Sequence, residues 1–98
     1  MISFIIPVLN EAKFIEQTFK TINKSIRLAK NIKKFEIIVV DDGSQDGIKD
    51  KINVLKSRYR NIVFVQNNKN MGMGFSIKKG ITLSKFKKFM IIPGGNDI

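Results

Sequence analysis

The 98-residue sequence contains no cysteine and no histidine. The lack of cysteine excludes disulfide bonds and thiolate metal sites. The lack of histidine removes the most common general base and the most common transition-metal ligand. Any chemistry at a site in this chain must therefore use carboxylates, amides, hydroxyls, lysines or backbone groups.

Long hydrophobic runs are missing as well. No apolar segment approaches the roughly 20 residues that span a bilayer, and the chain enters its first apolar run without the basic segment of a signal peptide. We therefore expect a cytoplasmic protein, either soluble or peripheral to the inner face of the membrane. With 43% hydrophobic and 27% charged residues, residues 1–98 have the composition of one globular domain or part of one.

Acidic residues are scarce, because eight Asp and Glu stand against 18 Lys and Arg. Fifteen of these cations are lysines, spread along the chain without the interleaved aromatic residues that stack on nucleic-acid bases. The net charge of +10 therefore favours a lysine-rich surface for anionic substrates or an anionic membrane face. We expect no nucleic-acid partner, and a basic nucleic-acid-binding protein is kept only as a distant third hypothesis for the function.

Four short apolar runs recur along the chain, at residues 2–6, 35–40, 61–65 and 88–92. They are nearly continuous and rich in Ile, Val and Phe, which is typical of strands that are buried on both faces of a parallel sheet. The sequence therefore predicts four strands.

Segments with helical spacing separate these runs. The third is the least regular, with Ile77 and Ile81 on one face. The alternation predicts an α/β fold, a mostly parallel sheet of about four strands with helices on both faces. The apolar stripes of the first two helices are Ile15, Phe19, Ile22, Ile26 and Ala29, and Ile48, Ile52, Leu55 and Tyr59.

Ligands of open α/β sheets lie beyond the carboxyl ends of the strands, so the loop after each run is informative. Pro7 is expected to end the first strand, because it cannot donate a ladder hydrogen bond. Asn10 and Glu11 then lie at the N-cap and first turn of a helix, and a purely structural role explains both when they are taken alone.

The second run ends in two adjacent acids, Asp41 and Asp42, followed by Gly and Ser. Either acid could cap a turn, but their mutual repulsion favours a binding role for the pair. Acids at this place in nucleotide-binding folds accept hydrogen bonds from a ribose or a base. Asp46 is the expected N-cap of a helix that begins near Gly47.

The third run leads to Gly72 and Gly74, a GxG ahead of a helix that could let the backbone approach a phosphate. A dinucleotide-binding fingerprint would need a glycine at Ile77 and a place after the first strand. The sequence also has no Walker A motif. Both observations argue against an NAD-type or P-loop domain.

The fourth run ends in PGGNDI. Asn96 and Asp97 offer the oxygen ligands that Mg²⁺ or Mn²⁺ prefer. An ordinary glycine turn with a polar tip explains the segment equally well.

Three segments, ISFIIPVLNE, EIIVVDDGSQDG and NKNMGMGFSIKKGI, together resemble the family 2 glycosyltransferases of the GT-A fold, in particular those of the dolichyl-phosphate mannose synthase kind. The resemblance implies a Rossmann-like domain that is incomplete relative to the full family domain and lacks the acceptor half. It also implies a nucleotide-diphosphate sugar donor (UDP- or GDP-sugar) and an acceptor hydroxyl or polyprenyl phosphate.

The same resemblance implies which residues contact the nucleotide. Pro7, Val8 and Leu9 would form the wall around the base, although Leu9 replaces the family's usual aromatic residue. Asn10 matches the family's asparagine, and Glu11 matches an acid near the base or ribose.

The paired acids and the glycines also match the family's pattern. Asp41 and Asp42 match its two acids, with Asp42 expected to contact the uracil or ribose. Gly72 and Gly74 match the glycines near the pyrophosphate. Met73 stands where a lysine or arginine is common, so one phosphate contact is missing.

The largest departure concerns the divalent cation, Mg²⁺ or Mn²⁺, that the resemblance implies. The family's Asp-x-Asp motif falls on Gly94, Gly95 and Asn96, none of which is acidic. Asp97 could replace the missing acid one position later. A non-catalytic binding or regulatory module of the same fold is therefore the main alternative, and an exposed sheet edge invites homo-oligomers.

Overall fold

The computed structural model of the chain describes residues 1–93, which form an alternating β/α domain. All strand pairs are parallel, and the sheet order is β3-β2-β1-β4. The predicted α/β class and the four strands are confirmed. The elements are β1 (Ile2–Val8), α1 (Ala12–Leu28), β2 (Phe35–Asp41), α2 (Ile48–Leu55), β3 (Ile62–Gln66), α3 (Met73–Leu83) and β4 (Phe89–Ile91).

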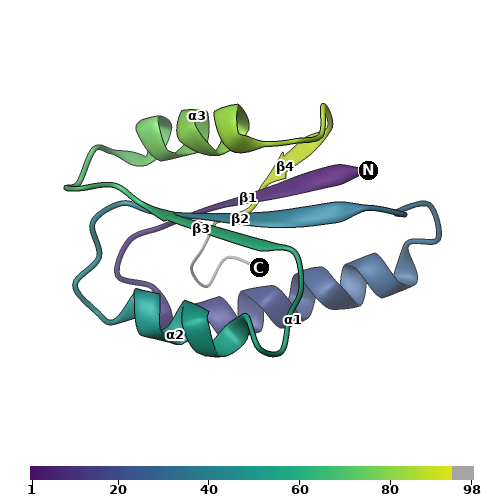
Figure 1. Cartoon of the computed structure of the whole chain (residues 1–98), viewed down its shortest axis with the longest axis horizontal. Helices are drawn as coiled ribbons and strands as arrows, with labels where there is room; N and C mark the ends of the chain where they lie inside the picture. Colours follow the sequence, from purple (N-terminus) through teal and green to yellow (C-terminus); the bar gives the residue numbers. More distant parts are fainter. Residues whose placement is uncertain (94–98) are drawn as a thin grey trace.

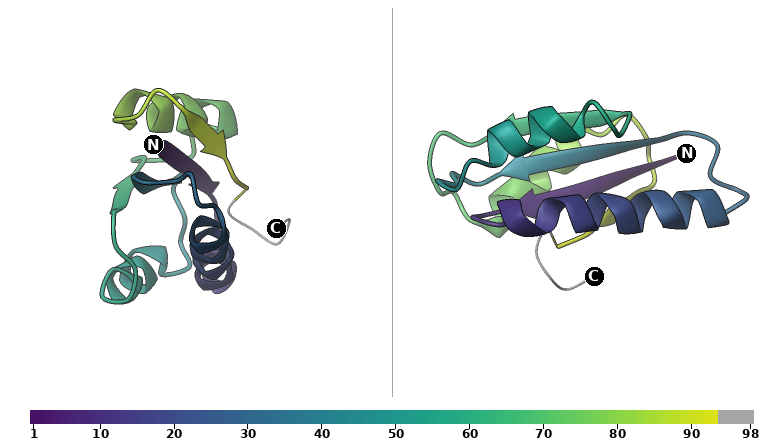
Figure 2. Two further views of the ribbon diagram at one scale, coloured as in Figure 1. Left: turned by 90° about the vertical axis from the view of Figure 1, so that its right-hand side faces the viewer. Right: turned by 90° about the horizontal axis from the view of Figure 1, so that it is seen from below.

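Helices cover both faces of the sheet, as predicted. Figure 1 shows α3 above the strands and α1 with α2 below them, and the end-on view of Figure 2 separates the same layers. The main hydrophobic core lies between the sheet and the α1–α2 layer, where Phe19 and Ile52 pack fully buried against alternate residues of β1 and β2. None of the helices among residues 1–93 has the length and hydrophobicity to cross a membrane.

The third helix approaches the sheet through small residues. Ser76 and Gly80 are its buried positions, whereas Ile81 is 38% exposed, so the expected apolar face of Ile77 and Ile81 is not the buried one. A Cβ atom at Gly80 would lie 2.4 Å from Cγ2 of Ile5. The close approach therefore requires glycine, and hydrophobic spacing could not reveal it.

The first strand does not end at Pro7, contrary to the prediction, but continues to Val8. The Ile92 N–H donates to the Ile5 carbonyl (2.8 Å), so the backbones of Ile5 and, two residues later, of Pro7 face β4. The missing N–H of Pro7 therefore removes no bond to β2. On the side that Pro7 faces, β4 ends at Ile91 and pairs no further than Ile5.

Burial differs between the central and the edge strands. Every residue of β1 and β2 is buried, as predicted for strands covered on both faces. The edge strand β3 is only partly buried, and β4 is exposed, with Met90 at 50%. The prediction of burial on both faces is therefore wrong for the two edge strands.

The two helices of the lower layer end earlier than their apolar stripes. α1 ends one residue before Ala29, and α2 ends at Leu55, so Tyr59 lies beyond it. The Tyr59 ring nevertheless packs edge to face on Phe19, with centroids 5.6 Å apart. A turn that follows α2 thus continues its contact with α1.

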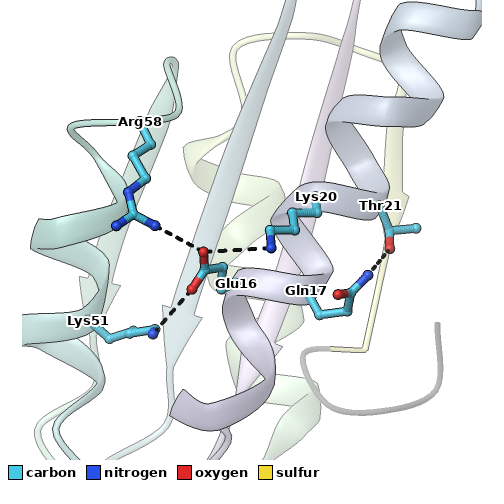
Figure 3. Close-up of polar contacts among 6 residues, drawn as sticks. All are labelled: Glu16, Gln17, Lys20, Thr21, Lys51 and Arg58. Atoms are coloured by element: carbon cyan, nitrogen blue, oxygen red, sulfur yellow. Dashed lines mark hydrogen bonds and ion pairs between the residues drawn. The ribbon is translucent and has the colours of Figure 1, made fainter.

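One carboxylate joins α1 to α2 on their outer surface. Glu16 of α1 pairs with Lys51 of α2 (3.4 Å), with Arg58 after α2 (3.0 Å) and with Lys20 (4.0 Å) (Figure 3). The side-chain hydrogen bond from Lys51 lowers the pKa of Glu16 below its usual value, against the opposing effect of desolvation. The carboxylate therefore stays ionised at neutral pH.

Candidate nucleotide-binding site

A small pocket opens at the carboxyl edge of the sheet, where the loops after β1, β2 and β3 meet. It has a volume of about 80 Å³ and is mainly apolar. Seven residues from β1, its loop, the end of β2 and the start of α3 line it: Pro7, Val8, Leu9, Glu11, Asp42, Met73 and Ser76.

Asp42 is the buried carboxylate of this pocket, with 5% of the residue exposed. It accepts hydrogen bonds from Asn67 Nδ2 (2.9 Å), the Met71 N–H (2.7 Å) and the Gly72 N–H (2.9 Å). A carboxylate offers about four acceptor positions. Asp42 thus holds the loop before α3 in place and keeps about one acceptor position for a ligand.

The charge state of Asp42 follows from these contacts. Burial raises the pKa of its carboxyl, but the hydrogen bonds from Met71, Asn67 and Gly72 together outweigh burial and lower the pKa below its usual value. Asp42 is therefore ionised at neutral pH and can only accept hydrogen bonds.

Asp41 has a separate set of partners. It is fully buried and accepts hydrogen bonds from the N–H (3.2 Å) and hydroxyl of Ser44 and from Gln66 Nε2 (3.2 Å). It does not line the pocket. The argument from like-charge repulsion is wrong, because Asp41 and Asp42 are satisfied independently by protein donors.

Two loops stabilise each other at this edge, and both predicted helix caps are wrong. Asn10, with φ 53°, does not cap α1, because its Oδ1 accepts from the Gln45 N–H (2.9 Å) in the neighbouring loop. Asp46 does not cap α2, where Gly47 holds the N-cap position, but accepts from the Ala12 N–H (2.8 Å) at the start of α1. The donors come from about 35 residues away, so local sequence rules could not find them.

Leu9 and Glu11 bring β1 and its loop to the pocket. Glu11 holds the N-cap position of α1 without capping it, and its Oε1 accepts from the Leu9 N–H (3.1 Å). Leu9 is 39% exposed beside the pocket. The structure therefore gathers Pro7, Val8, Leu9, Glu11 and Asp42 in the pocket. It places Asn10 in a supporting loop and Asp41 at the end of β2, outside the pocket lining.

The two glycines lie at the start of α3 and differ in their environment. Gly72 has φ 97°, which disfavours any other residue, and its N–H already donates to Asp42. A Cβ at Gly74 would meet no atom within 4 Å. The first N–H groups of α3 precede its first helical bond, from Ser76 to the Gly72 carbonyl (3.2 Å), and point away from the helix body, where they suit an anion.

Three residues near the pocket were not among the predicted site residues. Met73 and Ser76 line it, and Asn67 supports it by donating to Asp42 and to Ser76 Oγ (3.0 Å) while accepting from Lys79 Nζ (3.1 Å). Asn67 follows β3 directly. Because polar residues directly after a strand lie at this edge, its position could have identified Asn67 as a candidate site residue.

The predicted metal ligands Asn96 and Asp97, with Gly94 and Gly95, lie outside the described residues. Among residues 1–93 no group of three His, Cys, Asp or Glu residues could hold a metal ion. The paired acids after β2 are already occupied by protein donors. These residues alone therefore do not fit a divalent cation.

The comparison with known families decides the affiliation of the chain. Residues 3–92 match glycosyl transferase family 2. The chain belongs to this family. Among its family 2 relatives, the dolichyl-phosphate beta-glucosyltransferase ALG5D of Trichomonas vaginalis is 35% identical over 83 residues, which cover 81% of this chain and 25% of that protein. The glycosyltransferase AglE of Haloferax volcanii is 34% identical over 83 residues, 85% of this chain and 26% of that protein.

Solved structures confirm the GT-A, Rossmann-like fold of this family 2 chain. The mannosyltransferase PcManGT from Pyrobaculum calidifontis, in complex with GDP-Man and Mn²⁺, superposes with a TM-score of 0.82 at 18% identity, over 95% of this chain and 27% of that one. Glucosyl-3-phosphoglycerate synthase from Mycobacterium tuberculosis, with Mn²⁺ and UDP, gives a TM-score of 0.72 at 21% identity, over 96% and 33%. The chain thus spans about a quarter to a third of the length of these relatives.

Proposed function

We propose that this chain binds a UDP- or GDP-sugar at the carboxyl edge of its sheet, as the donor part of a glycosyltransferase that transfers the sugar to an acceptor hydroxyl or a polyprenyl phosphate. The observation that carries the proposal is the pocket that combines an ionised, buried Asp42 with an apolar wall. The named activities of the relatives, a dolichyl-phosphate glucosyltransferase and a mannosyltransferase in complex with GDP-Man, support it.

Base and ribose binding would use the wall and the two carboxylates of the pocket. Pro7, Val8 and Leu9 offer apolar contact to the face or edge of a base. The remaining acceptor position of Asp42 suits an N–H of the base or a ribose hydroxyl, because a fixed carboxylate is a strong acceptor. Glu11, which also lines the pocket, offers a second acceptor.

Diphosphate binding would use the start of α3. The free N–H groups and the positive end of the helix dipole favour negative charge there. Gly74 leaves open space beside this turn, so the backbone can approach the diphosphate closely. Met73 supplies no charge at this turn, so the turn itself neutralises the diphosphate only in part.

A divalent cation, Mg²⁺ or Mn²⁺, would supply the missing neutralisation by stabilising the charge on the departing nucleoside diphosphate. Two solved relatives are complexes with Mn²⁺ and a nucleotide or nucleotide sugar. We propose Asp97 and Asn96 as its protein ligands in this chain. We expect the acceptor site and the catalytic base in the part of the family's length that this chain does not span.

A specific observation favours a second candidate, a non-catalytic nucleotide-binding module of the same fold. Gly94, Gly95 and Asn96 replace the acids that hold the metal in the family. Both candidates bind nucleotide, so an assay of glycosyl transfer by the full-length protein with a nucleotide-sugar donor separates them.

Titration calorimetry tests donor binding directly. UDP, GDP, UDP-glucose and GDP-mannose are titrated into the full-length protein with Mn²⁺ and again with EDTA. We expect at least one nucleotide to bind, more tightly with Mn²⁺. If none of the four ligands gave a heat of binding, the proposal would be contradicted. If a ligand bound equally well in EDTA, only the role of the metal would be contradicted.

A further inference from the structure

The opposite, amino edge of the sheet carries an unusual concentration of positive charge. The three loops that lead into β2, β3 and β4 comprise residues 29–34, 56–61 and 84–88. Together they hold nine of the 18 Lys and Arg of the chain and no Asp or Glu. Because all four strands are parallel, the three loops lie at the same end of the molecule (Figure 1).

The structure joins these loops into one surface. The Ile2 N–H donates to the Lys34 carbonyl (3.1 Å), and the Ser3 N–H donates to the Lys88 carbonyl (3.0 Å), so β1 connects the first loop to the third. The three loops share a hollow lined by Lys33, Lys34, Phe35, Arg60, Asn61, Lys85 and Phe86. Seven of the nine cations form what we call the basic edge, because Lys56 is the C-cap of α2 and Arg58 pairs with Glu16: Lys30, Lys33, Lys34, Arg60, Lys85, Lys87 and Lys88.

The charges of the basic edge are not neutralised within residues 1–93. All ion pairs in that part of the chain involve Glu16. One of them neutralises Arg58, which lies in the loop between α2 and β3. The nearest acid, Glu36, is 2% exposed and accepts from Ser3 Oγ (2.6 Å) and from the Lys85 N–H (2.7 Å). Glu36 therefore faces inward, and the seven cations remain available to an external anion.

Exposed aliphatic side chains accompany these cations. Leu28 ends α1 with 73% of its surface exposed, Leu83 ends α3 with 43%, and Met1 precedes β1 with 64%. The ends of α1 and α3 and the start of β1 all lie at the amino edge. The surface thus combines lysines with aliphatic groups that can enter the outer layer of a membrane.

We propose that the basic edge docks this protein onto an anionic lipid bilayer. Six of its seven cations are lysines, which act as point charges on a diffuse negative surface and add about fivefold in affinity each. A nucleic-acid site would need exposed aromatic residues for stacking. At this edge Phe35 is buried beneath the guanidinium of Arg60, 5.8 Å from the ring centroid, and Phe86 is half-buried. Phe89, at 42% exposed, is a single exposed ring beside the lysines and forms no row on which successive bases could stack.

Docking through the basic edge has a consequence for the site at the other end of the strands. β1 is seven residues long, so about 20 Å separates the two edges. The nucleotide pocket would face the aqueous phase. This orientation favours an acceptor hydroxyl carried in solution over a polyprenyl phosphate in the same membrane.

Vesicle co-sedimentation tests the location of the docking surface. The full-length protein is mixed with phosphatidylcholine vesicles with and without phosphatidylglycerol. The triple variant Lys33→Gln, Lys34→Gln, Lys87→Gln should lose on the order of 100-fold in affinity for the anionic vesicles. The matched control is Lys24→Gln, Lys49→Gln, Lys78→Gln, which removes the same charge from exposed positions of the three helices and should lose little.

A fluorescence probe tests contact with lipid, because residues 1–98 contain no tryptophan and one introduced there can be compared with the unsubstituted protein. The emission of Leu28→Trp should shift to the blue on anionic vesicles, and that of Phe75→Trp, at the opposite edge, should not. Equal losses in both triple variants, binding to pure phosphatidylcholine, or tighter binding to single-stranded poly(A) RNA than to anionic vesicles would overturn the proposal. None of these readouts depends on nucleotide binding, so the outcome is separable from that of the proposed function.

Discussion

The two edges of one sheet are built in opposite ways. At the carboxyl edge, side chains hold the loops: Asp42 and Asp46 accept hydrogen bonds from backbone N–H groups of other loops. At the amino edge, backbone groups mainly hold the loops, and the charged side chains point outward. The acids at the carboxyl edge thus hold the loops around a pocket, whereas the seven cations of the basic edge form no ion pair within residues 1–93.

Helix dipoles account for only part of this asymmetry. Every helix of the βαβ units starts at the carboxyl edge and ends at the amino edge, so acids at the former and cations at the latter are both favourable. The effect decays within one turn. Lys87 and Lys88 lie beyond the last turn of α3, which ends at Leu83. Their positive charge is therefore not explained by the dipole.

The largest effect is expected from Asp42→Ala, which removes the central acceptor of the carboxyl edge. Three donors, including the Met71 and Gly72 N–H groups, lose their partner, and the free energy of unfolding should fall by about 2–4 kcal/mol. Nucleotide affinity should fall tenfold or more, about 1.4 kcal/mol. Urea unfolding and calorimetry measure the two effects.

The control for this variant is Asp50→Ala, which removes an exposed carboxylate from the first turn of α2. It should change the unfolding midpoint little and nucleotide affinity not at all. Unchanged affinity in a folded Asp42→Ala protein would remove Asp42 from the site.

The pH dependence of stability is a second test of the contribution of Asp42 to folding. The pKa of Asp42 is lower in the folded protein than its ordinary value of 3.8. Its contribution is therefore fully present above about pH 4 and is lost as the pH falls through the lowered folded pKa. Urea unfolding from pH 6 downward should show a smaller loss of stability in Asp42→Asn than in the unmodified protein.

A smaller effect is expected from Glu36→Gln, the corresponding buried carboxylate near the amino edge. The amide keeps one oxygen acceptor for the Ser3 hydroxyl and the Lys85 N–H but loses the charge, so stability should fall by about 1–2 kcal/mol. Nucleotide affinity should stay unchanged in calorimetry, because Glu36 lies at the other end of the strands. A parallel loss of affinity would show that the two edges are not independent.

Sequence patterns could predict some features of this fold and not others. The four strands and their parallel arrangement followed from the apolar runs, because burial imposes a recognisable pattern. The position of the nucleotide site stays a prediction, and a pocket lies at the edge where the loops after the strands were expected to meet. The two helix caps failed, since Asn10 and Asp46 serve neighbouring loops rather than the nearest helix. Contacts between loops distant in sequence leave no local pattern.

Three further differences between prediction and structure also come from contacts between segments that are distant in sequence. The buried face of α3 consists of Ser76 and Gly80, because the helix lies close to Ile5, and no apolar spacing marks that face. Pro7 stays within β1 because β4 is short on the side that Pro7 faces. The basic edge followed from the sequence only as net charge, since its three loops come together through the parallel topology.

Gly74→Ala should separate stability from binding at the carboxyl edge. The new methyl group meets no atom within 4 Å, so the helix should gain about 0.5–1 kcal/mol. If the diphosphate lies against this turn, nucleotide affinity should nevertheless fall severalfold. Thermal unfolding and calorimetry give both values. A more stable variant with unchanged affinity would place the diphosphate elsewhere.

The smallest effect is expected from Glu16→Gln, in the ion pairs that lie between the two edges (Figure 3). These pairs are exposed and screened by salt, so the melting temperature should fall slightly in low salt and hardly at all in high salt. Because the folded pKa of Glu16 is lowered, the difference should be present above about pH 4.5 and vanish as the pH falls below the folded pKa. Vesicle binding should be unchanged or slightly stronger, since the substitution frees Arg58 beside the basic edge. A large loss of vesicle binding would mean that Glu16 positions the docking surface. The ion pairs between α1 and α2 would then affect the amino edge.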